Sequence, residues 1–159
     1  MTNKNENMEV EANEVETKGR DVSFFLSGAA EEVTSEFVPI SKRFKDGEGK
    51  IVKFEMKAIE TEKVDEIQKQ CMINDYVNRK LVGKKLDQQR FSARIAVEST
   101  LYPNFKDAQL RKSYKTEDPI EVAKKMLSVP GEYTELISNA MRINGFDDYD
   151  EDLVDDVKN

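Results

Sequence analysis

Residues 101–114 read LYPNFKDAQLRKSY, and this stretch decides how the second half of the chain is divided into elements. Pro103 disfavours helical backbone at the residue before it, so a helix that approaches this point must end there. Asp107 can cap a short helix over residues 107–114, because its carboxylate accepts hydrogen bonds from N–H groups that lack a partner within the helix. We therefore predict a proline-broken turn that leads into a capped short helix. Aromatic side chains here and just beyond are expected to pack in the core: Tyr102, Phe105, Tyr114 and Tyr133.

Capping signals and helical spacing of apolar residues predict further helices on both sides of this stretch. Thr61 and Asp87 are N-cap residues before it, and Asp118 followed by proline is an N-cap after it. Gly145 stands where a left-handed C-terminal cap is expected. The predicted helices span residues 61–78, 87–101, 107–114, 118–128 and 132–144.

Two details of these helices depend on the spacing alone. In the first helix, Val64, Ile67 and Cys71 are expected to point inward, with Met72 and Tyr76 as further inward positions. The second helix is expected to bury an apolar stripe that extends as far as Leu101. A basic cluster lies between the two helices, and we interpret it as a solvated loop: Arg79, Lys80, Lys84 and Lys85.

The alternation of apolar and polar residues over residues 37–58 predicts a β-hairpin. Its turn is the four-residue loop Asp46-Gly47-Glu48-Gly49, where glycine permits positive φ. A two-stranded hairpin is marginal alone, so its apolar face must pack on helices or its edge must pair with another strand, including one from another subunit. The predicted fold class is α+β: one N-terminal antiparallel hairpin packed on a mostly helical C-terminal part, in a single domain over residues 21–146. The inward positions are Val38, Ile40, Phe44, Val52, Phe54, Met56 and Ala58.

The formal net charge of -7 is concentrated at the two ends of the chain. Residues 1–20 carry five acids and three bases, and residues 147–159 carry seven acids and one base. Both tails are predicted to be disordered, because they hold too few apolar side chains to offset the entropy of ordering. A near-neutral body with acidic ends argues against nucleic-acid binding, which requires clustered Lys and Arg.

Several other classes of protein are disfavoured by what the sequence lacks. The chain has no histidine, the usual general base at neutral pH and a common metal ligand, so we expect neither an enzyme nor a cofactor. The single cysteine cannot form an internal disulfide, which suits the cytoplasm. The longest apolar run is much too short to span a bilayer, so no membrane partner is expected.

Two segments are candidates for binding a partner protein. Phe24, Phe25 and Leu26 form an apolar group on a predicted short helix over residues 21–30, which either docks on the protein's own core or inserts into a partner. The second candidate is the acidic end with its apolar neighbour: Asp147, Asp148, Asp150, Glu151, Asp152 and Leu153. Asp148, Asp150 and Asp152 have the spacing of ligand positions 1, 3 and 5 in an EF-hand calcium loop. Position 6 of that loop should be glycine and is Leu153, and position 12 should be a bidentate glutamate and is Asn159, so no metal site is predicted.

Several separated blocks together resemble the XkdN-like family of phage tail assembly chaperones. Residues 102–114 are similar to the family pattern P-x-(L/F)-K-D-A-x-L-x-x-S-Y, and the hairpin turn is similar to the family's SKRF-D-x-x-G-K. The resemblance covers roughly residues 21–146 and leaves out both acidic tails. The remaining blocks are residues 122–127 (VAKKML), 130–133 (PGEY) and 143–146 (INGF).

The resemblance implies a non-enzymatic assembly factor of a long-tailed phage, prophage or phage-derived tail particle. It would bind the tape measure protein in the cytoplasm of the bacterial host before the tail tube polymerises, and would be absent from the mature particle. Related systems also make a longer form by ribosomal frameshifting. The open edge of the hairpin, and not the resemblance, points to self-association. Two alternatives stay open: a structural component that remains in the mature tail, and a small cytoplasmic protein-binding regulator.

Overall fold

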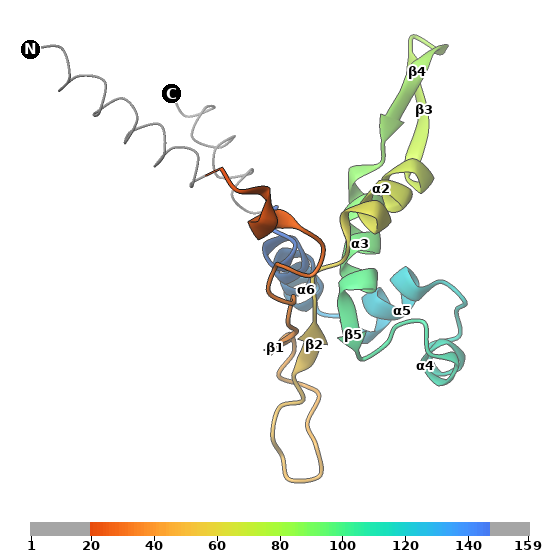
Figure 1. Cartoon of the computed structure of the whole chain (residues 1–159). Coiled ribbons are helices and arrows are strands. Elements are labelled where there is room, and N and C mark those ends of the chain that lie inside the picture. Colours follow the sequence, from red (N-terminus) through yellow and green to blue (C-terminus); the bar gives the residue numbers. More distant parts are fainter. Residues whose placement is uncertain (1–19, 147–159) are drawn as a thin grey trace, which may run out of the picture. The chain divides into compact units, whose positions relative to one another are not determined.

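A computed structural model describes residues 20–146 of the chain (Figure 1). The chain divides after Val33 into two compact units, Met1–Val33 and Thr34–Asn159. The described part of the first unit contains η1, a 3-10 helix over Val22–Phe25. Its N-cap is Asp21, whose carboxylate accepts a hydrogen bond from the Ser23 N–H at 2.9 Å. The predicted tails fall almost entirely outside the described residues.

The second unit has the predicted α+β class, and its N-terminal hairpin is confirmed. Strand β1 (Glu36–Val38) pairs antiparallel with β2 (Phe54–Met56), with Phe37 opposite Glu55. The predicted turn is closed by Asp46, whose carboxylate accepts hydrogen bonds from the Glu48 and Lys50 N–H groups at 2.8 and 3.0 Å. The hairpin face packs inward as expected, because Val38, Ile40, Phe54 and Met56 are all buried.

A third strand covers the other edge of β2. Strand β5 (Thr100–Tyr102) pairs with β2, so the sheet order is β1-β2-β5. The helix predicted over residues 87–101 therefore ends earlier than expected: α3 spans Gln88–Ser99, and the chain continues as a strand. Leu101 and Tyr102 are exposed instead of buried, which corrects both predictions. Pro103 favours extended backbone before it, and β2 offers an unpaired edge to receive that segment.

The remaining helices follow their capping signals. Helix α4 spans Ala108–Ser113, α5 Pro119–Met126 and α6 Pro130–Ile143. Asp107 and Asp118 cap α4 and α5 through side-chain hydrogen bonds, as predicted. Helix α6 begins two residues before the predicted start, because a proline at the first helical position needs no N–H partner.

The region between residues 71 and 86 differs most from prediction. Helix α2 spans only Thr61–Gln70, so the helix predicted over residues 61–78 is wrong in its last part. There the chain forms strand β3 (Met72–Val77), which pairs with β4 (Lys80–Leu86) in a second antiparallel hairpin. Of the basic cluster predicted as a loop, Lys80, Lys84 and Lys85 thus lie in strand β4, and only Arg79 lies in a turn. We call this β3–β4 hairpin the arm, and Figure 1 shows it extending away from α2 and α3.

The second unit has two hydrophobic clusters. Cluster 1 joins the three-stranded sheet to α3, α5 and α6, and contains Phe105, which is fully buried and meets Phe54 edge-on with 6.2 Å between ring centroids. Tyr114 and Tyr133 pack against cluster 1, as predicted. Cluster 2 consists of Ile67, Cys71 and Ile95. The prediction that Cys71 serves as a buried small side chain is confirmed.

Candidate functional site

The arm carries exposed apolar side chains on both faces. Residues opposite each other in an antiparallel pair point to the same face, so Tyr76 and Leu81 form a cross-strand pair. Their exposed fractions are 58% and 61%, whereas Tyr76 was expected to point into the core. An exposed apolar hairpin with open strand edges is an unusual surface for a folded protein and indicates protein binding. Four more large apolar residues of the arm are exposed: Met72, Ile73, Val77 and Val82.

The turn and the register of the arm explain why its sequence did not alternate clearly. Asn78 and Arg79 connect the strands with φ of 51° and 66°, both in the left-handed region that a two-residue hairpin turn requires. The register shifts between Asp75 and Tyr76, because Gly83 faces Asp75 while Leu81 faces Tyr76. Val82 is the extra residue of this bulge, which offsets the alternation along β4.

The arm is also basic. Four cationic residues and one carboxylate lie within residues 72–86. The carboxylate, Asp75, forms an ion pair with Lys85 at 3.2 Å. Among the described residues no ion pair involves Arg79, Lys80 or Lys84, so these three cations add to the positive charge of the arm.

The base of the arm is anchored in cluster 2. The Asp87 N–H donates to the Cys71 carbonyl at 2.9 Å, which closes the hairpin where both strands leave the helices. Leu86, the last residue of β4, packs against cluster 2, and so does Phe146, the last described residue of the chain. Cys71 is buried in cluster 2, and this burial raises the pKa of its thiol, which disfavours the nucleophilic thiolate.

The partner-binding residues predicted from the sequence lie elsewhere. Phe24, Phe25 and Leu26 belong to the first unit and are exposed, Phe25 to 87%. The acidic set lies outside the described residues: Asp147, Asp148, Asp150, Glu151, Asp152 and Leu153. The arm is a hairpin that the helical spacing of its apolar residues did not predict. The signals that favour a hairpin are Asn78 and the β-branched and aromatic residues on both sides of it.

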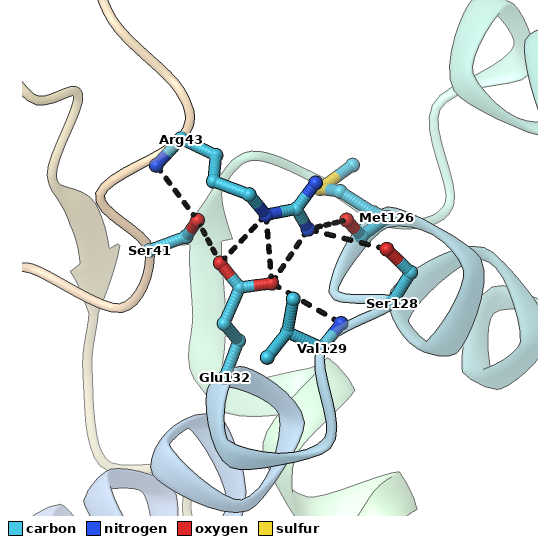
Figure 2. A network of polar contacts seen from close by, with 6 residues as sticks. All are labelled: Ser41, Arg43, Met126, Ser128, Val129 and Glu132. Carbon is cyan, nitrogen blue, oxygen red and sulfur yellow. Dashed lines mark hydrogen bonds and ion pairs between the residues drawn. The ribbon is translucent and has the colours of Figure 1, made fainter.

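A polar network joins the β1–β2 hairpin to the helices at the start of α6 (Figure 2). Arg43 donates to both carboxylate oxygens of Glu132, with an Nη2–Oε1 distance of 2.5 Å and an Nε–Oε2 distance of 3.0 Å. Ser41 donates a second short hydrogen bond to the same carboxylate. Arg43 Nη2 also donates to the Met126 carbonyl at the end of α5 and to Ser128 Oγ. The bond to Arg43, followed by that to Ser41, lowers the pKa of Glu132 to about 2.

Glu132 also reaches back to the N-cap of its own helix. The Val129 N–H donates to Glu132 Oε1 at 3.4 Å, which is the half of a capping box that the N3 side chain supplies. The side chain of Val129 has no acceptor for the other half. Two of the blocks that carry the family resemblance, SKRF and PGEY, therefore meet in space. Their role here is to hold the β1–β2 hairpin on helices α5 and α6.

A third block, residues 143–146, forms the C-terminal cap of α6. The Phe146 N–H donates to the Met141 carbonyl at 2.9 Å and the Gly145 N–H to the Arg142 carbonyl at 3.0 Å, the two bonds of a Schellman motif. Gly145 has φ of 79°, which confirms the predicted left-handed cap. Asn144 donates from its amide to Ser99 Oγ and accepts from the Ile59 N–H, which ties this cap to the end of α3 and the start of α2.

A cleft of about 650 Å³ lies between the start of α3 and helices α5 and α6. The residues that line it include charged side chains of both signs and one tyrosine: Arg90, Asp118, Glu121, Lys124 and Tyr133. Within residues 20–146 no group of three or more His, Cys, Asp or Glu side chains could hold a metal ion. No helix in that range has both the length and the apolar composition needed to cross a bilayer.

Comparison with known proteins gives one consistent result. The family described as phage XkdN-like tail assembly chaperone protein matches residues 22–158, so the match extends past residue 146, where the resemblance was expected to end. The uncharacterized protein YqbN of Bacillus subtilis (strain 168) is 54% identical over 139 residues, which cover 87% of this chain and 93% of that protein. The XkdN protein of the phage-like element PBSX from the same organism is 46% identical over 159 residues, covering 100% of both chains. A crystal structure of YqbN superimposes with a TM-score of 0.70 at 50% identity, covering 80% of this chain and 98% of that one. The chain therefore belongs to the XkdN-like family of phage tail assembly chaperones.

Proposed function

We propose that this chaperone binds the tape measure protein of its phage or phage-derived tail before the tail tube polymerises, and then leaves. The observation that carries the proposal is the exposed apolar surface of the arm, centred on the Tyr76–Leu81 pair. A second contact is proposed at Phe24, Phe25 and Leu26, which are exposed in the first unit. A chaperone needs such surfaces because its task is to cover apolar segments of another protein.

The chemistry of these surfaces suits a long helical client with apolar stripes. An exposed hairpin offers main-chain groups at its edges and alternating side chains on its faces, and apolar anchors can enter a groove of a partner. Many copies along one client would add to its solubility through their net charge of -7 each. The acidic residues 147–153 are proposed to contribute to this effect and to partner contact. None of this requires catalysis, so we propose a non-enzymatic role in the host cytoplasm.

Co-expression with the cognate tape measure protein tests the proposal. The expected result is co-purification of the two proteins and a larger soluble fraction of the tape measure protein. The double variant Tyr76→Ser/Leu81→Ser should lose both effects. A matched control is available on β5: Leu101→Ser/Tyr102→Ser changes the same residue types at exposed fractions of 49% and 56%, and should retain both effects.

Two outcomes would contradict the proposal. One is the failure of the unchanged protein to co-purify with the tape measure protein or to increase its solubility. The other is stoichiometric presence of the protein in purified mature particles by mass spectrometry, which would favour a structural component of the tail. A variant of Phe24, Phe25 and Leu26 to serine tests the second contact separately.

A further inference from the structure

We infer that the acidic C-terminal segment, residues 147–159, binds the arm of its own chain along strand β4. The segment begins directly after Phe146, and this residue packs against the same cluster as Leu86, where β4 ends. The attachment point of the acidic segment therefore lies at the base of the basic arm.

The reach of the segment is sufficient. Thirteen residues follow Phe146, and at about 3.3 Å per extended residue they span about 43 Å. Strand β4 has seven residues, so its length is about 23 Å on the same scale. The segment can follow β4 from base to turn, even if several residues are used to change direction.

The charges of the two segments are complementary. Residues 147–159 carry seven acids and one base, and the arm carries four bases and one acid, which Lys85 already pairs. Lys80 and Lys84 are exposed on β4, and neither forms an ion pair with another described residue. Opposite charges on neighbouring strands stabilise a sheet, and their attraction decreases as salt is added.

The apolar residues are complementary as well. Leu153, Val154 and Val157 interrupt the acidic run, and Leu81 and Val82 are exposed on β4. The edge of a two-stranded sheet presents unpaired N–H and C=O groups, and an extended segment that pairs with it satisfies them. Attachment within one chain gives the segment an effective concentration on the order of millimolar, which favours its own arm over that of a second copy.

The consequence is a built-in competitor. The segment covers part of the apolar arm until a partner with a better-fitting surface displaces it, so the arm is not left open to non-specific association. The inference concerns contact within one chain and holds whether or not the partner is a tape measure protein.

Hydrogen exchange of backbone amides tests the inference directly. The full chain is compared with a chain that ends at Phe146, and circular dichroism establishes that both are folded. Amides in β4 should exchange about fivefold or more faster in the shortened chain at low salt. Addition of the synthetic peptide 147–159 should restore slow exchange in a saturable way, and high salt should abolish the effect.

A matched pair of charge variants separates specific contact from general attraction. Lys80→Glu/Lys84→Glu should remove the difference between the full and shortened chains. Lys45→Glu/Lys53→Glu changes the net charge equally on the β1–β2 connection and should leave the difference intact. Equal exchange in the full and shortened chains would overturn the inference. So would protection of β4 that rises with protein concentration, because this would assign the contact to a second copy.

Discussion

Phe105 offers the sharpest test of the prediction that aromatic side chains of residues 101–114 stabilise the core. Its side chain is fully buried in cluster 1 and meets Phe54 edge-on, with an interplanar angle of 61°. Truncation to alanine removes the ring and leaves a cavity, which costs about 3–5 kcal/mol for a buried phenylalanine. The aromatic contact accounts for roughly 0.5–1.5 kcal/mol beyond the burial itself. We therefore expect Phe105→Ala to remove a large share of a total stability of about 5–15 kcal/mol.

Urea denaturation followed by circular dichroism measures this loss. With a slope of about 1–3 kcal/mol/M, a loss of this size lowers the urea midpoint by roughly 2 M. The melting temperature should fall on the order of 10–20 °C. Tyr102→Ala is the control from the same stretch, because Tyr102 is 56% exposed and its truncation should cost no more than about 1 kcal/mol. Similar losses for the two variants would refute the assignment of Phe105 to the core.

Three further predictions follow from the geometry. Arg79→Gly should slow amide exchange in the arm several-fold with little change in the global melting temperature, because glycine adopts the φ of 66° without the steric cost that arginine bears; unchanged or faster exchange would contradict this. The pKa of Glu132 is about 2 against an ordinary 4.5, so its pairing with Arg43 contributes stability that is present above pH 4.5 and is lost as the pH falls toward 2. Glu132→Gln should flatten the dependence of melting temperature on pH in that window, whereas Glu135→Gln on the same helix should preserve it. Cys71 should react with an aromatic disulfide reagent far more slowly in the native protein than in urea, because the thiol is buried and its pKa is raised; equal rates would show that cluster 2 is open.

Local signals in the sequence predicted most helix starts correctly. Asp87, Asp107 and Asp118 cap helices through hydrogen bonds to N–H groups two or three residues away. Such bonds depend only on nearby residues, so spacing along the chain is enough to identify them. The same holds for Gly145, whose positive φ ends α6.

The second hairpin was missed because helical spacing and strand formation compete over the same residues. Ile67 and Cys71 are four residues apart and both are buried, so a helical stripe continuing to Tyr76 was consistent with the pattern. The arm has apolar residues exposed on both faces and a bulge at Val82, so it lacks the alternation that identifies a strand with one buried face. A sequence signal based on burial cannot identify a hairpin whose side chains remain exposed.

The sequence by itself determined the α+β class, the first hairpin, the caps at Asp87, Asp107, Asp118 and Gly145, and the family, because these depend on short-range backbone preferences and on ordered blocks of residues. The predicted cap Thr61 is instead the first residue of α2, and the N-cap is Glu60. Only the tertiary structure decided that Arg43 and Glu132, 89 residues apart, hold the hairpin on the helices. It also decided that β5 completes the sheet and that the apolar residues of the arm lie at the surface. The physical reason is that exposure is not a property of a residue or of its neighbours in the chain. It depends on which faces other elements cover, and in the described part of the second unit they bury Val38, Phe54 and Met56 of the sheet and leave the arm exposed.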